Sequence, residues 1–371
     1  MRIKTLHGSF CFDEQRFKDD QGNETESWLQ ISGHNLHNGR TIGLEKMLCK
    51  YVLSNSYRRT KEIIIDITGE DAIISPPKIR EIGIENAAKV CHYHALEAQS
   101  TLDAHLMPEI QTDINIYNKK ETEVIIEIDS VLAKEQKAQR NNQPKEKKHF
   151  VFNTLAAIET TDGQWHYIND GVEEYPSNGL KFKDLIKSAF IEEHGKQEET
   201  ITKPVNVIAI SDGAKDIRNL LQEIFDKVPI IILDWYHLKK KVNAYMSMFG
   251  LKLKVKKEHI KIILKYLWFG NTEKAINHLR GISVKRDDIR EELIKYLIKH
   301  KEEIINYKKR KQAGKTIGSG LIENTVDLAV SSRQKGKKMS WRKTGSKALA
   351  TLATVDLNGK WDEIWNYLYA A

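Results

Sequence analysis

Three predicted strands each end on an aspartate. Asp129 follows the run VIIEI, Asp212 follows VIAIS and Asp234 follows IIIL. In open α/β sheets, ligands bind in the crevice outside the carboxyl ends of the strands, so acids at these ends converge on one place. Carboxylates packed together repel each other and raise one another's pKa unless a cation neutralises them. The spacing therefore indicates a cation site.

A pair of divalent metal ions is the simplest cation that fits such a cluster. Oxygen-only ligands suit Mg²⁺ or Mn²⁺, and two such ions about 3.5–4 Å apart serve in-line phosphoryl displacement. A further acid, Glu323, stands in the segment GKTIGSGLIEN, where glycines precede it and a basic cluster follows. The structural alternative stays open for each aspartate, because Asp212 and Asp234 can cap the helices that follow them and Asp129 can begin a turn.

The elements that must position these acids lie in the middle of the chain. Three strand-like runs separated by turn residues predict an antiparallel meander, and the later alternation of helices and strands predicts parallel, buried strands. The expected strands are residues 123–129, 149–159, 165–169, 205–211 and 229–234, and the expected helices are residues 178–195 and 214–225. The polar, basic segment 133–149 is too charged for the core and is interpreted as a hairpin loop. The fold class is therefore α/β with a mixed sheet.

Helical patterns flank this sheet on both sides. Residues 43–53, 57–68 and 75–99 are predicted to form three helices joined by short turns, an arrangement that resembles a helix-turn-helix. A small helical bundle without DNA-binding function gives the same pattern. Residues 238–371 carry apolar residues at helical spacing almost throughout.

Basic charge is concentrated in the last third of the chain. Residues 235–371 contain 30 Lys and Arg against 13 Asp and Glu, whereas the whole chain has a net charge of only +8. Such a segment attracts a polyanion, and nucleic acid is the commonest partner of this kind. The same excess of lysine and arginine is also expected if these residues lie on helix faces exposed to solvent.

Composition narrows the class of protein. The chain has 371 residues, of which 40% are hydrophobic and 30% charged, and its apolar runs are shorter than a membrane span. The N-terminal residues lack the pattern of a secretory signal. Three scattered cysteines without a C-x-x-C pair disfavour a disulfide scaffold or a cysteine zinc site. We expect a protein of the reducing cytoplasm.

Two segments together resemble a known family, the DDE-type insertion-sequence transposases of bacteria. They are VIAISDGAKDIRNLLQEIFDKVPIIILDWYHLKKKV and TIGSGLIENTVDLAVSSRQKGKKMSWRKTGSKALATL, and the resemblance covers roughly residues 120–355. The similarity is to the Kra and Lre types, which are related to the Mutator-like group. Its motifs occur in the family's order: D-G-A after a strand, an acid-x-x-His pair after the next strand, then G-S-G-x-I-E with a trailing R-x-K-G-x-x-M-x-W.

The resemblance implies a fold and a domain organisation. It implies an RNase H-like catalytic domain in residues 121–237, interrupted by an all-helical insertion at 238–314 and completed by a catalytic helix and tail at 315–371. Residues 1–120 would form a mostly helical N-terminal region. Some relatives carry a cysteine-rich zinc-binding N-terminus, which this chain lacks, so the helices within 43–99 are expected to recognise the DNA ends.

The resemblance also assigns roles to residues. The catalytic, metal-binding acids fall on Asp129, Asp212 and Glu323, which would hold two Mg²⁺ or Mn²⁺ ions, and Asp234 and His237 match the accessory acid-x-x-His pair. Many relatives follow the first acid with glycine, whereas this chain has Ser130. The implied activity is cleavage at transposon ends followed by joining to target DNA, both by in-line phosphoryl transfer.

Basic residues near the motifs are candidates for contacts to DNA phosphates, which position a duplex without reading its sequence. These are Lys239, Lys240, Lys241, Arg333, Lys335, Lys337, Lys338, Arg342 and Lys343. Trp341 can stack on a base or pack in the core. The expected partners are double-stranded DNA and further copies of the chain on paired ends, in a bacterial, nucleoid-associated setting with no membrane.

Two alternative functions on this fold remain open at this point, besides the possibility that the basic third serves RNA or a membrane surface. A nuclease or junction resolvase on the same fold would use the same acids without strand transfer. A transposase-derived protein that only binds DNA is the other alternative, although all the motif acids are intact.

Overall fold

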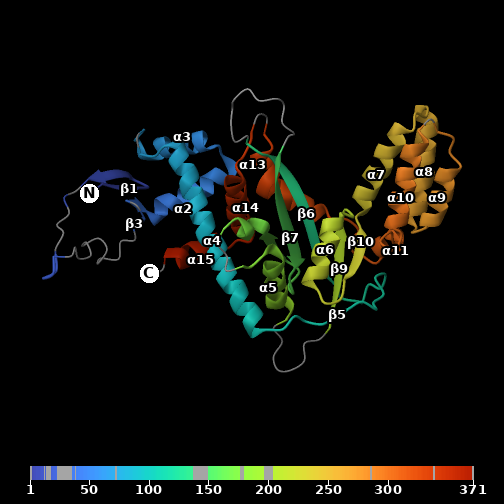
Figure 1. Ribbon diagram of the computed structural model, residues 1–371, viewed down its shortest axis with the longest axis horizontal. Helices are drawn as coiled ribbons and strands as arrows, with labels where there is room; N and C mark the ends of the chain where they lie inside the picture. The colour runs from blue at the N-terminus through green and yellow to red at the C-terminus, as the bar shows by residue number, and fades with distance from the viewer. Residues whose placement is uncertain are drawn as a thin grey trace.

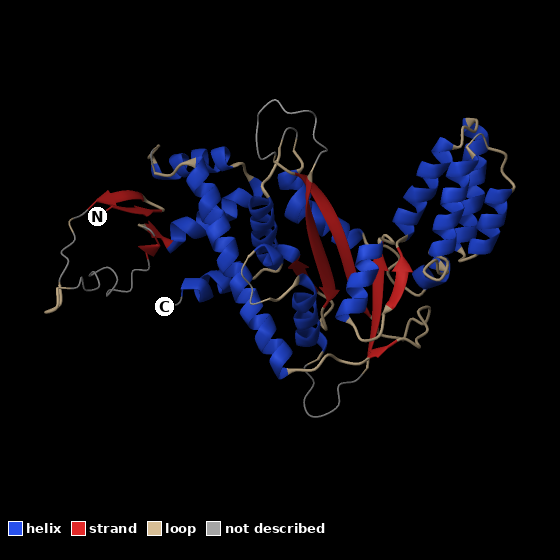
Figure 2. Cartoon of the chain, viewed as in Figure 1, coloured by secondary structure: helices blue, strands red, loops and turns tan. Residues whose placement is uncertain are grey.

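The computed structural model places a sheet at the centre of the molecule, with helices to either side (Figure 1). It describes residues 2–11, 13, 18–22, 36–37, 39–71, 73–136, 149–175, 179–195, 204–284, 286–336 and 339–369. The N-terminal helices lie at one end of the view and a separate helical bundle at the other, as the colouring by secondary structure also shows (Figure 2).

The N-terminal region combines a small sheet with three helices. The helices α2 (Ile42–Ser54), α3 (Tyr57–Thr68) and α4 (Pro76–Ala104) confirm the three predicted ones, and α4 extends five residues further than expected. Ser56 and Ser75 cap α3 and α4 through their side chains. The small sheet was not predicted; its strands are β1 (Arg2–Thr5), β2 (Gly8–Cys11), β3 (Leu36–His37) and β4 (Arg40–Thr41).

The central sheet is mixed, as the sequence predicts. Its strand order is β10-β9-β6-β7-β8, with β5 paired to β9. Strands β6, β7 and β8 form the antiparallel meander, and β9 and β10 run parallel to β6. The strands are β5 (Ile110–Gln111), β6 (Val124–Lys134), β7 (Phe150–Glu159), β8 (Trp165–Asn169), β9 (Val205–Ser211) and β10 (Ile230–Leu233). The α/β fold class is confirmed.

Helices cover the two faces of the sheet. Even-numbered residues of β6, such as Ile126 and Ile128, pack with α5 (Phe182–His194) and α6 (Lys215–Ile224). Val131 packs on the other face against helix α12 (Gly320–Val326). Because side chains alternate across a strand, Glu127 and Asp129 share this second face with Val131.

One strand end differs from the prediction. Strand β6 continues to Lys134, so Asp129 lies in the middle of the strand instead of at its end. The extra residues pair with Phe150 to Thr154 of β7, which keeps the ladder intact beyond Asp129. Asp212 and Asp234 do follow the last residues of β9 and β10.

Five helices occupy the region expected to be a helical insertion, as far as the structure describes it. Their core is continuous with side chains of β6, β9 and β10, and the helices extend to one side of the sheet (Figure 1). The first begins at Trp235, directly after Asp234. They are α7 (Trp235–Met248), α8 (Leu253–Trp268), α9 (Thr272–Arg280), α10 (Asp287–Lys299) and α11 (Tyr307–Gln312).

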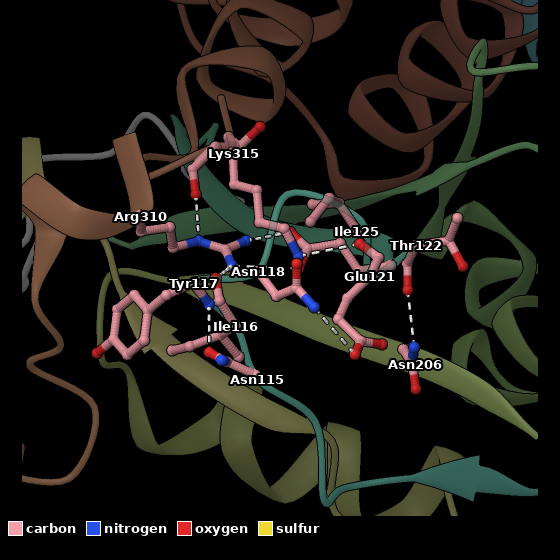
Figure 3. A network of polar contacts seen from close by, with 12 residues as sticks. Asn115, Ile116, Tyr117, Asn118, Glu121, Thr122, Ile125, Asn206, Arg310 and Lys315 are labelled. Carbon is pink, nitrogen blue, oxygen red and sulfur yellow. Dashed lines mark hydrogen bonds and ion pairs between the residues drawn. The ribbon is translucent and has the colours of Figure 1, made fainter. Parts of the chain in front are cut away.

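A buried arginine joins the end of this helical region to the start of β6 (Figure 3). Arg310 forms an ion pair with Glu123, and its Nε donates to the carbonyl of Thr316 at 2.7 Å. Lys315 donates to the same carboxylate at 2.7 Å. This pairing fixes where the chain re-enters the sheet before Glu323.

The chain ends in helices that pack on the sheet and on α4. Helix α12 continues through a π-helical turn, η2 (Asp327–Ser331), into α13 (Ser332–Gln334), and is followed by α14 (Lys343–Leu357) and α15 (Trp361–Tyr369). A 3₁₀ turn, η1 (Asp170–Glu174), follows β8. Within the described residues, no helix combines the length and apolar character needed to cross a membrane.

Candidate active site

Asp234 is the buried anchor of the site. Its carboxylate caps α7 by accepting from the backbone N–H of His237 at 2.8 Å, and it accepts from both the N–H and the Oγ of Ser319, the latter at 2.6 Å. Burial by itself would raise the pKa of Asp234, but the hydrogen bonds from His237 and Ser319 hold that pKa down at about 2. Asp234 is therefore ionised and fully bonded inside the protein.

The G-S-G segment before Glu323 is shaped to fit against Asp234. The N–H of Trp235 donates to the carbonyl of Ile317 at 3.0 Å, so this segment runs directly beside the end of β10. A Cβ on Gly318 would lie 2.5 Å from the ring of Tyr236 and 3.3 Å from Asp234. Glycine is thus required at 318 for close approach, and serine at 319 supplies the two donors.

These contacts bring Glu323 to His237. Glu323 lies one turn into α12, and its Oε1 is 3.3 Å from Nδ1 of His237, which is 3.8 Å from Oδ2 of Asp234. Asp234 first, and then Glu323 and Asp212, raise the pKa of His237. Asp234, His237 and Glu323 form the one group of three possible metal ligands within 4.8 Å of one another in the described residues.

Asp129 and Asp212 lie beside this group. Asp129 is half-buried, and burial together with the nearby charges of Asp212 and Glu323 raises its pKa. One oxygen of Asp129 accepts from the N–H of Ser130, and one oxygen of Asp212 accepts from the N–H of Ala214 at 2.8 Å. The second oxygen of each carboxylate has no protein donor among the described residues, so both acids keep free metal-binding capacity.

The predicted site residues therefore separate into two sets. Asp234 and His237 contact Glu323 as a tight group, whereas Asp129, Asp212 and Glu323 are electrostatic neighbours that do not form a group within 4.8 Å. The sequence prediction gave the metal to the second set. Asp234 has three protein donors on its carboxylate, which makes it the less available ligand.

Glu127 belongs to the site and was missed by the sequence analysis. It is 1% exposed, and its Oε2 accepts from the N–H of Ile322 at 2.9 Å, at the N-terminus of α12. Its Oε1 is buried without a partner. Burial, followed by the charges of Asp234 and Glu323, raises the pKa of Glu127 to about 7. The available signal was a single acid inside the apolar run VIIEI.

The turn after Asp212 is held by the end of the helical bundle. Gly213 has a φ of +87°, and a Cβ there would lie 2.7 Å from the imidazole of His300. His300 Nδ1 is 2.6 Å from Glu303, which also forms an ion pair with Arg218 of α6. The glycine of D-G-A is therefore required by its backbone conformation and by the ring packed against it.

The candidate phosphate-contacting residues occupy different environments. Lys239, Lys240, Lys335 and Arg342 are exposed, whereas Lys241 lies over the rings of Tyr245 and Tyr296. Lys343 is ion-paired with Glu174 at 2.7 Å. Arg333 is 7% exposed and lies against the rings of Tyr57 and Trp341 instead of on the open surface. Lys337 and Lys338 lie outside the described residues.

Removing the Ser319 hydroxyl tests the anchor. Ser319→Ala is expected to lower the free energy of unfolding by about 1.5–3 kcal/mol, because a hydrogen bond to a buried carboxylate is lost. Urea denaturation measures this. The control is Ser332→Ala, which removes an exposed hydroxyl bonded to the carbonyl of Leu328. Equal stability of the two variants would contradict the anchoring role of Ser319.

Comparison of the chain with protein-family models, curated proteins and solved structures finds no match.

Proposed function

We propose that the chain is a DDE-type transposase that cuts transposon DNA ends and joins them to target DNA. One observation carries the proposal. Glu323, which is far from Asp129 and Asp212 in the sequence, lies on a helix held against β6 and β10, and its charge acts on Asp129, as does the charge of Asp212. The C-terminal third of the chain, which contains Glu323, is strongly basic. The mixed sheet with its helical interruption supports an RNase H-like catalytic domain.

The carboxylate oxygens at the site are ligands of the kind that divalent metal ions prefer. Asp129, Asp212 and Glu323 would hold two Mg²⁺ or Mn²⁺ ions, since each aspartate keeps a free oxygen and the Glu323 side chain is 49% exposed. Such a pair, when bound, stabilises the attacking and leaving oxygens of an in-line phosphoryl displacement. Burial first, and then the charges of Asp212 and Glu323, raise the pKa of Asp129, and a bound cation would offset these charges.

The remaining residues position these acids. Asp234 and Glu127 bond to the first turn of α12 and so set the place of Glu323. His237 lies between Asp234 and Glu323, where its protonated form offsets their negative charge. The exposed lysines at the start of α7 follow directly after this site and would contact phosphates of the bound duplex.

The test is a joining assay with the wild-type chain. DNA that carries the chain's own coding region and its flanking sequence is incubated with a target plasmid, with Mg²⁺ or with EDTA. Joined products that require Mg²⁺ are the expected result. Cut ends without joined products would replace the proposal with a nuclease, and duplex binding without cutting would replace it with a DNA-binding protein.

A further inference from the structure

A pocket of 780 Å³ lies outside the candidate active site, where the N-terminal helices meet the C-terminal part of the chain. It is lined by the starts of α3 and α4, by Arg333 and by residues 339–342 and 344–345. Figure 1 shows α3 and α13 near each other at this end of the sheet. Trp341 pairs with the end of β6 beside it, donating its N–H to the carbonyl of Lys134 at 2.8 Å. The pocket is therefore formed by segments far apart in the sequence.

A buried positive charge faces this pocket without an acid. Arg333 is 7% exposed, and its guanidinium lies 4.8 Å from the ring centre of Trp341 and 5.5 Å from that of Tyr57. Its Nε donates to the carbonyl of Val52, and the two terminal nitrogens have no partner among the described residues. Burial lowers the pKa of Arg333. A buried charge without a counter-ion is costly, which points to an anion supplied from outside.

Three helix N-termini point to the same place. Residues in the first turns of α3, α4 and α14 line the pocket, and the positive end of a helix dipole favours an anion. Ser56 and Ser75 cap α3 and α4, whereas α14 has no side-chain cap, so the N–H groups of its first turn stay available.

Exposed arginines complete the positive lining. Arg58, Arg80 and Arg342 all line the pocket and are exposed. None of these three side chains has an acidic partner within the described part of the chain. By contrast Arg59, the next residue on α3, points elsewhere and is ion-paired with Glu62. Arg58 and Arg80 thus face the pocket without an acidic partner, unlike Arg59.

We propose that this pocket binds a phosphate group of the DNA backbone, outside the catalytic centre. The proposal rests on the proposed function, because that function supplies the DNA. Glu135, which forms a β-bridge with Trp341, directly follows β6 and is six residues from Asp129. Six residues of extended chain span about 20 Å. A duplex that enters the active site can therefore reach the pocket, and Arg333 would bind its phosphate by paired hydrogen bonds.

The test compares two double variants that remove the same charge. Arg58→Ala with Arg80→Ala removes two pocket arginines, and Arg59→Ala with Lys61→Ala removes two cations of α3 that are paired with Glu62 and Asp71 outside the pocket. Arg333 is kept, because its burial makes its removal a risk to folding. Inorganic phosphate and a duplex oligonucleotide serve as the two probes.

Two results are expected. Phosphate, compared with chloride at equal ionic strength, should raise the thermal unfolding midpoint of the wild type and the control variant but not of the pocket variant. The slope of log affinity for duplex DNA against log salt should be smaller by about 1 in the pocket variant than in the control, as expected for one lost phosphate contact.

Two outcomes would overturn the inference. Equal phosphate stabilisation of all three proteins would mean that the pocket binds no phosphate. If phosphate no longer stabilises the pocket variant but the salt slope of its DNA affinity is unchanged, the pocket is a site for a free anion instead of DNA. Neither measurement requires cleavage, so a wild type that fails to cut DNA would remove the proposed function while leaving phosphate binding at the pocket intact.

Discussion

Asp212→Asn is expected to abolish Mg²⁺-dependent cutting of DNA while leaving duplex binding in place. The change keeps the size of the side chain and the oxygen that accepts from the N–H of Ala214, so the turn after β9 should survive. It removes one negative charge from the cluster of Asp129, Asp212 and Glu323. A bound metal contributes several kcal/mol of transition-state stabilisation, so the expected loss of rate is about 10²–10⁴-fold.

Single-turnover cleavage measures this loss, and fluorescence anisotropy with labelled duplex measures binding. Asp216→Asn is the matched control, because Asp216 is an exposed acid in the first turn of α6, four residues further along. It should cut DNA at the wild-type rate. Cutting with Mg²⁺ that survives Asp212→Asn would show that Asp212 is not a metal ligand in this reaction.

Local patterns in the sequence predict most of the sheet and the helices. The runs VIIEI, VNVIAIS and IIIL are apolar and bounded by turn residues, so their strand character is set locally and the structure confirms it. In the structure, Ser56 and Ser75 cap the starts of α3 and α4. The pairing of β6 with β7 beyond Asp129 could not be predicted, because it depends on a partner strand across a loop.

The small N-terminal sheet was missed for a similar reason. Its strands are two to four residues long, too short to show an alternating pattern, and β1 pairs with β4 across a long stretch of chain. Short strands of this kind form only when tertiary contacts assemble them.

The site divides in the same way between predictable and unpredictable parts. Asp212, Asp234 and Glu323 follow recognisable strand ends or a glycine-rich motif, which is why the sequence indicates them. The bonds from Ser319 to Asp234 and from Ile322 to Glu127 join segments 85 and 195 residues apart. Such contacts carry no local signal, so the positioning roles of Asp234 and Glu127 became visible only in three dimensions.

Glu127 gives the second large expected effect, on stability against pH. Its pKa is raised from its ordinary value of 4.5 to about 7, mainly by burial. A raised pKa means that folding favours the protonated carboxyl, so its contribution to stability is full below pH 4.5 and is lost as pH rises through about 7. Above that range the ionised, buried carboxylate costs roughly 3 kcal/mol.

Glu127→Gln is therefore expected to make the protein more stable at pH above 7, by as much as roughly 3 kcal/mol, with the advantage fading toward pH 4.5. The glutamine oxygen can still accept from the N–H of Ile322, so α12 should keep its place. Urea denaturation across this pH range, with a chelator present, measures the difference between variant and wild type.

The expected effect of Glu127→Gln on stability arises from burial of the carboxyl, so the control is the same change at an exposed glutamate. Glu302→Gln makes the same chemical change at an exposed position and should leave the pH dependence of stability unchanged. If Glu127→Gln matches the wild type at every pH, then Glu127 is ionised at no cost. The N–H of Ile322 and the positive end of α12 would then outweigh its burial. In that case Glu127 anchors α12 as a permanent anion, and its burial adds nothing to the pH dependence of stability.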